Sequence, residues 1–158
     1  MTKGKNKIEA AALRLLTYRD RSVQELRDRL NRRFEPAEVE SVLAHLKELG
    51  YLDDLRFARN YVDSRNRNRP RGNYLLRLEL GRKGIADAVI EEVLNSQEEE
   101  YQLAFLLAQE RFKSLEKVEE PKRLRRLYSL LQRRGFPWSI ARRAVGELLD
   151  SDPQKEYN

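Results

Sequence analysis

The chain has 158 residues, which is the length of one ordinary domain or of an array of small units. Its 32 Lys and Arg against 26 Asp and Glu give a net charge of +6, which favours nucleic acid or an acidic protein surface as a partner, although many such charges simply coat helices. The absence of Cys excludes disulfide scaffolds, thiol nucleophiles and Cys-ligated zinc.

The sequence also bears on compartment. No apolar run approaches the roughly 20 residues that a membrane helix needs. The basic segment MTKGKNK at the start is not followed by an apolar stretch, so it does not resemble a signal peptide. We therefore expect a cytoplasmic protein that contacts no membrane.

Three segments of the sequence share one spacing. RRFEPAEVESVL, KGIADAVIEEVL and RGFPWSIARRAV begin at positions 32, 83 and 134. They place Phe34, Ile85 and Phe136 at a constant step of 51 residues. Equal spacing of matched apolar positions predicts three copies of one unit, with these three residues buried at equivalent places. Arg33 stands where the other two copies have Gly, so we expect the first turn to close differently.

The first unit predicts three helices. Ser22 and Glu25 match a capping box, in which the Ser hydroxyl accepts from the Glu amide and the Glu carboxylate reaches back. Gly50 suits the left-handed position that ends a helix. Apolar residues at helical spacing place the three helices at 8–17, 23–30 and 36–49.

The second and third units repeat this plan. The segment 101–115 is apolar on more than one face, so we expect it to be central in its unit. Alternating runs of β-branched residues are absent, which predicts an all-α protein with almost no sheet. Units of about 50 residues are marginal alone and should stack as an elongated, curved array. We predict repeats at 1–50, 51–97 and 98–150, followed by a disordered tail at 151–158.

Catalytic candidates are poor. His45, the one histidine, lies at the edge of an apolar helical stripe, which favours a structural or surface role. GRKG at 81–84 lacks the spacing and the Ser or Thr of a phosphate loop, so it is a helix end. Asp53 and Asp54 are either a metal pair or helix caps, and capping is the commoner role at a helix start. Of the aromatic residues that could stack on bases, Trp138 is expected to pack between helices.

Arginine-rich stretches are more informative. SRNRNRPRGN, from Ser64 to Asn73, places four arginines at every second position and is predicted to be an extended loop between two helices of the middle unit. We hypothesise that about two of the four contact DNA phosphates or acidic side chains at once, because alternating positions face opposite ways. Further basic residues lie along the second helices of the first and third units.

A three-helix unit can also be a helix-turn-helix reader, with its last helix in the major groove. Two of the three last helices are acidic, carrying Glu38, Glu40 and Glu48 or Asp87, Glu91 and Glu92. Phosphates flank the groove and would repel them. A sequence-specific repressor is therefore disfavoured, although the third unit, with Arg142 and Arg143, stays open as a reader.

Three stretches carry a family resemblance. RSVQELRDRL (21–30), LGYLDDLRFARNYVDSR (49–65) and LELGRKGI (78–85) resemble RecX, the bacterial regulators of the RecA recombinase. The resemblance spans nearly the whole chain. It implies a crescent of three three-helix repeats that bind the RecA filament groove near DNA and inhibit strand exchange and ATP turnover. One departure is Gly72-Asn73-Tyr74, where the family has Gly-Pro followed by basic residues.

The resemblance and the basic residues together predict a monomeric, non-enzymatic inhibitor of RecA filaments. It would act in recombination, repair and the DNA-damage response, with no cofactor and no metal. Single- or double-stranded DNA would be bound weakly and electrostatically. The alternative is a basic helical DNA-binding protein without a recombinase partner. The predicted contact residues are Arg27, Arg32, Arg33, Arg65, Arg67, Arg69, Arg71, Arg77, Arg82, Lys83, Arg125, Arg126, Arg133 and Arg134.

Overall fold

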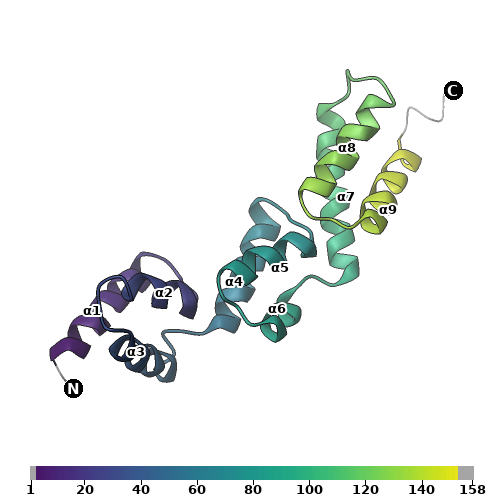
Figure 1. The fold of residues 1–158 in the computed structure, drawn as a ribbon. Coiled ribbons are helices and arrows are strands. Elements are labelled where there is room, and N and C mark those ends of the chain that lie inside the picture. Colours follow the sequence, from purple (N-terminus) through teal and green to yellow (C-terminus); the bar gives the residue numbers. More distant parts are fainter. Residues whose placement is uncertain (1–2, 153–158) are drawn as a thin grey trace. The chain divides into compact units, whose positions relative to one another are not determined.

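The computed structural model describes residues 3–152, which form nine α-helices and no β-strand (Figure 1). This confirms the predicted all-α class and the three sets of three helices. Residues 153–158, most of the predicted disordered tail, lie outside the described residues. The helices are α1 (Lys3–Tyr18), α2 (Val23–Leu30), α3 (Pro36–Glu48), α4 (Asp54–Asn68), α5 (Asn73–Arg82), α6 (Asp87–Val93), α7 (Gln97–Ser114), α8 (Lys122–Arg133) and α9 (Trp138–Asp150).

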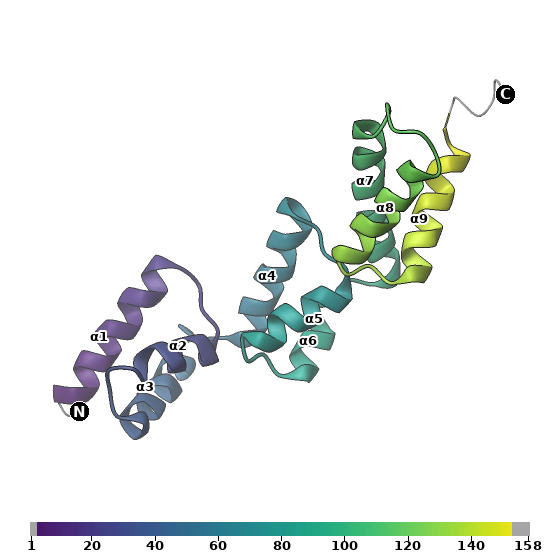
Figure 2. The ribbon, with the colours of Figure 1, turned by 45° about the horizontal axis from the view of Figure 1, so that its top comes forward.

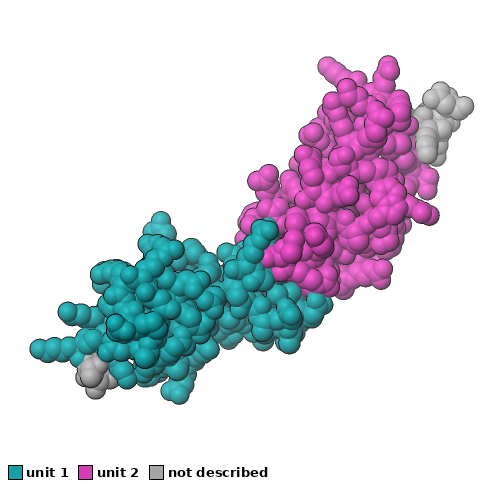
Figure 3. Space-filling view, viewed as in Figure 1, with its two compact units in different colours: residues 1–61, 79–93 teal, residues 62–78, 94–158 magenta. Residues whose placement is uncertain are grey.

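The helices gather into two compact units (Figure 3). Unit 1 holds the chain up to residue 61 together with residues 79–93, and unit 2 holds residues 62–78 and the chain from residue 94. Helices α4 and α5 each have one end in unit 1 and the other in unit 2. The middle set of helices therefore contributes to both units.

The core of unit 1 is built where α1, α2 and α3 meet (Figure 2). Ile8 and Ala12 of α1 are fully buried, as is Leu26 of α2. Val39 and Leu46 of α3 complete the contact. These residues recur at three- and four-residue steps, so each helix buries one stripe and leaves its charged face in water.

The core of unit 2 is organised around α7, which packs against both α8 and α9 (Figure 1). Ala104 and Ala108 of α7 are fully buried, and small side chains there let the neighbouring helices approach. Leu127 of α8 and Ala144 of α9 are also fully buried. The predicted central position of 101–115 is therefore confirmed.

The turns after α5 and α8 need glycine. Gly84 and Gly135 have φ values of 76° and 84°, which L side chains rarely adopt. In each turn the residue after the glycine donates to a carbonyl five residues back, from Ile85 to Leu80 and from Phe136 to Leu131. This is the bonding of a Schellman motif, which satisfies carbonyls at a helix end. Gly50 ends α3 in the same way, as predicted.

The matching turn after α2 closes differently, as the sequence predicts. Arg33 has no positive φ, and the Phe34 amide donates four residues back to the Leu30 carbonyl at 3.0 Å. Phe34 is consequently only half-buried, whereas Ile85 and Phe136 are 4% and 3% exposed. The prediction of equal burial at the three positions is wrong for Phe34.

Both predicted caps are present. Ser22 and Glu25 form the reciprocal capping box at the start of α2. The Asp53 carboxylate accepts from the Arg56 amide at 3.1 Å and so caps α4. Asp54 reaches across to accept from the Val23 amide at 2.9 Å. The two acids therefore satisfy the first amides of two helices, which confirms the capping role.

The arginine-rich stretch is mostly helical, which corrects the prediction of an extended loop. Helix α4 runs to Asn68, so Arg65 and Arg67 lie in its last turn. Arginine and asparagine do not break a helix, and the first breaker in this stretch is Pro70. The Arg69 amide still donates to the Arg65 carbonyl at 2.9 Å. Arg65 and Arg69 consequently lie one turn apart on the same side, and only the link from Arg69 to Gly72 is non-helical.

Candidate functional site

The α4–α5 link lies against the turn between α8 and α9, and two glycines make this contact possible. The Gly72 amide donates to the Arg134 carbonyl at 2.6 Å. A Cβ atom on Gly72 would overlap the Gly135 carbonyl, and one on Gly135 would lie 2.6 Å from Cγ of Leu75. Arg134 also donates from Nη1 to the Pro70 carbonyl at 3.3 Å. The two backbones are therefore in direct contact. This contact brings Arg69 and Arg71 of the link into the same region as Arg133 and Arg134 at the end of α8.

A polar network fixes the link on its other side. The Asn73 amide donates to the Glu100 carboxylate at 2.6 Å. The Asn73 side chain bonds to both backbone groups of Asn95, and Asn95 exchanges side-chain bonds with Asn66. Glu100 is only 5% exposed, and its burial raises the pKa of this carboxyl despite the Asn73 bond. The asparagines hold the end of α4, the start of α5 and the start of α7 together.

A surface groove opens beside this contact. It encloses ≈ 510 Å³ between the α4–α5 link, α7 and the end of α8. Leu107 and Leu130 contribute apolar wall, and Glu110 is the one carboxylate in its lining. The cations that line it are Arg69, Arg111, Arg133 and Arg134.

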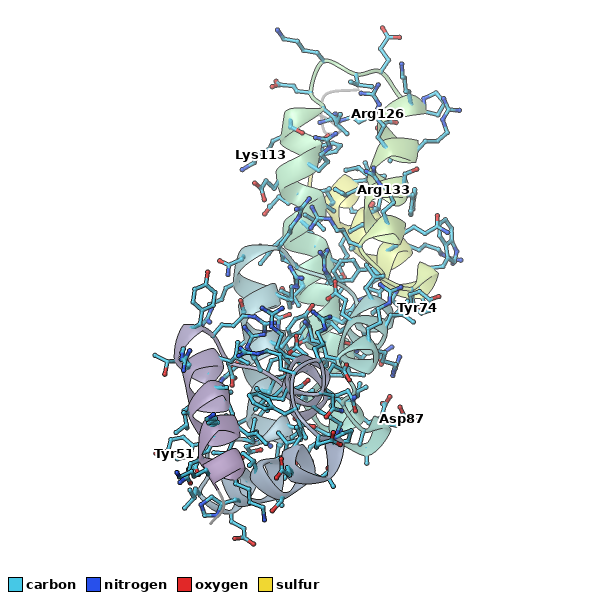
Figure 4. All side chains as sticks on the ribbon, turned by 60° about the vertical axis from the view of Figure 1, so that its left-hand side comes forward. Tyr51, Tyr74, Asp87, Lys113, Arg126 and Arg133 are labelled. Atoms are coloured by element: carbon cyan, nitrogen blue, oxygen red, sulfur yellow. The ribbon has the colours of Figure 1, made fainter. Side chains whose placement is uncertain are left out.

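A second hollow of ≈ 600 Å³ continues along α8 and shares Arg111 and Arg133 with the first. It adds Lys122, Arg125 and Arg126, all exposed, and its lining contains no acid. Figure 4 shows Arg126 and Arg133 along α8 and Lys113 near the end of α7. We call the cations of both hollows the α8 surface, defined as Arg69, Arg111, Lys122, Arg125, Arg126, Arg133 and Arg134.

Helix α8 forms this surface because its sequence divides by face. Leu127 and Leu131 are fully buried on one side, while Arg125, Arg126 and Arg133 occupy the other. An amphipathic helix whose polar face is almost entirely cationic necessarily presents a stripe of positive charge.

The positive charges of the α8 surface lie close enough to act on one another. The pKa of Arg134 is lowered, first by burial and then by the charges of Arg69, Arg71 and Arg133. Within residues 3–152, no member of the α8 surface forms an ion pair with an acid. Like charges held together without anions repel one another, and a polyanion would relieve that repulsion.

The other predicted contact residues are dispersed. In unit 1, Arg27 is paired with Glu40, while Arg32 and Arg33 are exposed beyond α2. Lys83 is paired with Glu25 at 3.5 Å and lies over the rings of Phe57 and Tyr61. Arg82 and Arg77 are exposed on α5, and Arg67 is exposed on α4, where Arg65 is half-buried. The structure thus brings together six of the predicted residues, in or beside the α8 surface. They are Arg69, Arg71, Arg125, Arg126, Arg133 and Arg134.

Helix α9 offers less to a nucleic acid than its sequence indicates. Arg143 forms ion pairs with Glu98 at 3.2 Å and Glu147 at 3.8 Å, and its guanidinium lies 3.6 Å from the centre of the Tyr101 ring. Trp138 at the start of α9 packs against Tyr128 of α8, with 4.9 Å between the ring centres, so it contacts a neighbouring helix as predicted, but it is 64% exposed and is not buried between the two helices.

Among the described residues, no group of three or more His, Asp or Glu side chains is placed to hold a metal ion. None of the helices in that part of the chain combines the length and apolar character required to cross a membrane. His45 is half-buried on α3.

Sequence reasoning missed Arg111 and Glu100. Arg111 lies in an apolar helix, and its place between the two hollows follows from how α7 packs on α8. Glu100 belongs to the acidic run EEE at the start of α7, where any of the three could face water. The sequence does contain one indication of a buried acceptor. Asn73 stands at a helix start where the family has Pro, and unlike Pro it has a backbone amide that can donate to a carboxylate.

Comparisons with known proteins agree over most of the chain. Family models for the first, second and third three-helix domains of RecX match residues 10–46, 53–94 and 98–145. A relative named regulatory protein RecX from Chlorobium phaeobacteroides is 36% identical, over 89% of this chain and 92% of its own length. A relative of the same name from Prosthecochloris aestuarii is 38% identical, over 87% of this chain and 91% of its own length.

A solved structure shows the same fold. The crystal structure of RecX from Lactobacillus salivarius has a TM-score of 0.84 at 22% identity, covering 94% of this chain and 98% of that one. A second crystal structure of regulatory protein RecX has a TM-score of 0.81 at 24% identity, covering 90% and 73%. The three matched domains and the relatives over 30% identical show that the chain belongs to the RecX family of regulatory proteins.

Proposed function

We propose that this protein is a cytoplasmic, non-enzymatic inhibitor of RecA recombinase filaments, and that the α8 surface is its main contact with the filament. The observation that carries the proposal is the convergence of seven cations that have no acidic partner in the described chain. Membership of the RecX family supplies the partner. The α8 surface would bind DNA phosphates or acidic recombinase side chains.

The proposed mechanism is that the protein inhibits the filament by staying bound to it. A filament must change contacts between its subunits and its DNA as it turns over ATP and exchanges strands. A bound protein that holds phosphates and recombinase acids together opposes that change, since any ligand favours the state in which it makes more contacts. We expect ATP turnover and strand exchange to fall together as the protein occupies the filament.

The test is a titration of this protein into RecA turning over ATP on single-stranded DNA. We expect ATP turnover to fall as the protein is added. The variant Arg125→Gln/Arg126→Gln/Arg133→Gln should inhibit much less, because three exposed cations of the α8 surface are gone. The control is Arg59→Gln, which removes a single exposed arginine that is paired with Glu92 in unit 1.

Salt dependence gives the same test a second readout. Each phosphate contact that is lost should reduce the slope of log affinity against log salt by about 0.7–0.9, so the triple variant should lose about two in slope or more. Unchanged inhibition and slope in the triple variant would remove the α8 surface from the proposal. Salt-dependent DNA binding with unchanged ATP turnover would identify a DNA-binding protein without a recombinase partner.

A further inference from the structure

A second groove lies in unit 1, between α1 and the end of α2, and it belongs to no site described above. It encloses ≈ 510 Å³. Arginines come from both of its walls. One lies on α1, and the others lie in the link before α2, in the last turn of α2 and in the segment that follows α2. They are Arg14, Arg21, Arg29, Arg32 and Arg33.

The floor of the groove is apolar. Leu15 and Phe34 are half-buried in it, and Leu30 lies beneath them at 2% exposure. The Tyr18 ring at its edge is 85% exposed, although it stands beside these apolar side chains. Apolar surface that stays in water between charged walls is typical of a binding site for a side chain of matching character.

The charges of the groove are unbalanced. Its lining contains no acid, and in the part of the chain that the structure describes none of its five arginines forms an ion pair. The adjacent Arg19 and Arg27, by contrast, are paired with Glu25 and Glu40. Burial lowers the pKa of Arg21, and the charges of Arg19 and Arg29 act in the same direction. Anions are therefore the complementary ligand for the walls.

We propose that this α1–α2 groove binds a peptide segment in which acidic residues flank one apolar side chain. Arginine forks pair with carboxylates in a fixed geometry, and the floor of Leu15, Leu30 and Phe34 would take the apolar side chain. A sugar–phosphate backbone would match the arginine walls but would leave the aliphatic part of the floor, Leu15 and Leu30, without a complementary group. The proposal concerns a different surface from α8 and holds whether or not RecA is the partner.

The experiment measures fluorescence anisotropy of a labelled peptide with two glutamates on each side of a central leucine, in the absence of RecA and DNA. Three comparison probes separate the contributions: the same peptide with Ser for Leu, the same peptide with Gln for Glu, and an oligothymidylate of equal net charge. We expect the first peptide to bind best. Either substitution in it should weaken binding about tenfold, since each removes one of the two complementary contacts.

Variants locate the binding. Arg14→Gln/Arg32→Gln removes one exposed arginine from each wall and should weaken peptide binding about tenfold or more. Arg125→Gln/Arg126→Gln removes the same charge from the α8 surface and should leave peptide binding unchanged. Circular dichroism and urea unfolding establish that both variants fold as the parent does.

Three results would overturn the proposal. Equal binding of the Ser and Leu peptides would show that the floor is not used. Equal loss in the two double variants would show general electrostatic attraction. Tighter binding of the oligothymidylate, lost with Arg14 and Arg32, would assign the groove to nucleic acid instead.

Discussion

Helices α8 and α9 are neighbours in unit 2 and both carry exposed arginines, but these arginines differ in what surrounds them. Arg143 of α9 is held by Glu98, Glu147 and the Tyr101 ring. Arg125 and Arg126 of α8 have no acidic partner among the described residues. The sequence does not distinguish these two kinds of arginine, whereas the structure separates charges that stabilise the fold from charges left for a partner.

This difference makes a general prediction. Changing a charge that already has a partner should alter the free energy of unfolding and leave the salt dependence of binding unaltered. Changing a charge of the α8 surface should alter the salt dependence of binding and leave the free energy of unfolding nearly unaltered, because exposed charges without partners contribute little to stability.

The largest effect is expected from Gly135→Ala, which attacks the turn that joins α8 to α9. The φ of 84° costs Ala about 1–2 kcal/mol, and the overlap of its Cβ with Leu75 costs about 1–3 kcal/mol more. Urea unfolding should therefore show a loss of about 2–5 kcal/mol. DNA binding should weaken too, because the turn positions Arg134 beside the α4–α5 link.

Gly146→Ala is the matched control for that variant. Gly146 lies inside α9, and a Cβ there would meet nothing within 4 Å. A gain of about 0.5–1 kcal/mol is expected, since Ala loses less conformational entropy in a helix than Gly. A similar loss in both variants would contradict the role of the turn.

Asp53→Ala tests a partnered charge in unit 1. Removing the cap of α4 should lower the free energy of unfolding by about 0.5–2 kcal/mol, as measured in urea. Asp53→Asn retains an acceptor and should keep most of the stability. The salt dependence of DNA binding should be that of the parent, and a steeper slope would indicate that this carboxylate repels DNA.

Arg143→Gln should cost about 1 kcal/mol, because the cation–π contact is worth about 0.5–1 kcal/mol and exposed ion pairs add little. Burial and the Glu147 hydrogen bond raise the pKa of Tyr101 to about 12, and Arg143 opposes this rise. Spectroscopic titration should therefore find the Tyr101 pKa higher still in the variant. An altered salt slope for DNA binding would place Arg143 with the α8 surface and break the comparison.

The smallest effect is expected from Glu100→Gln. The pKa of Glu100 is raised above its ordinary value of 4.5, chiefly by burial, so the folded protein holds this proton more tightly than the unfolded chain. Its contribution to stability is complete below that ordinary value and falls as pH rises through the folded pKa. In the variant, the Gln side chain can still accept a hydrogen bond from the Asn73 amide. Urea unfolding should therefore show that the free energy of unfolding of the variant rises relative to that of the parent as pH increases from about 4.5. A lower free energy of unfolding for the variant than for the parent at high pH would show that the ionised Glu100 stabilises the fold.

Periodicity made the fold predictable. The 51-residue step, the capping box at Ser22 and the glycines after α5 and α8 each fix a local conformation without any knowledge of distant residues. The acids at the start of α4 were predictable for the same reason, since a helix start exposes amides that a carboxylate satisfies.

The candidate sites were predictable only in part. The basic character of α8 follows from its sequence, but the partners of Arg143 and Arg27 depend on how helices pack, which a linear pattern does not contain. The prediction of an extended loop is wrong because arginine favours a helix, so alternating arginines do not indicate non-helical backbone. The α1–α2 groove was not predictable from the sequence, because Arg14 and Arg32 lie on different elements and come together only in the fold.

The start of α2 has a consequence for hydrogen exchange. The first amides of a helix lack intrahelical acceptors, and they usually exchange fast with solvent. Here the Val23 amide donates to Asp54 and the Glu25 amide to Ser22, whose hydroxyl in turn donates to the Lys83 carbonyl at 2.6 Å. The Val23 proton can leave only when the start of α2 separates from the start of α4, and the Ser22 hydroxyl that holds the Glu25 amide is itself held by a segment distant in the sequence. The eight-residue helix α2 should therefore be protected from its first turn, and its exchange rates would report the opening of unit 1 rather than fraying of the helix end.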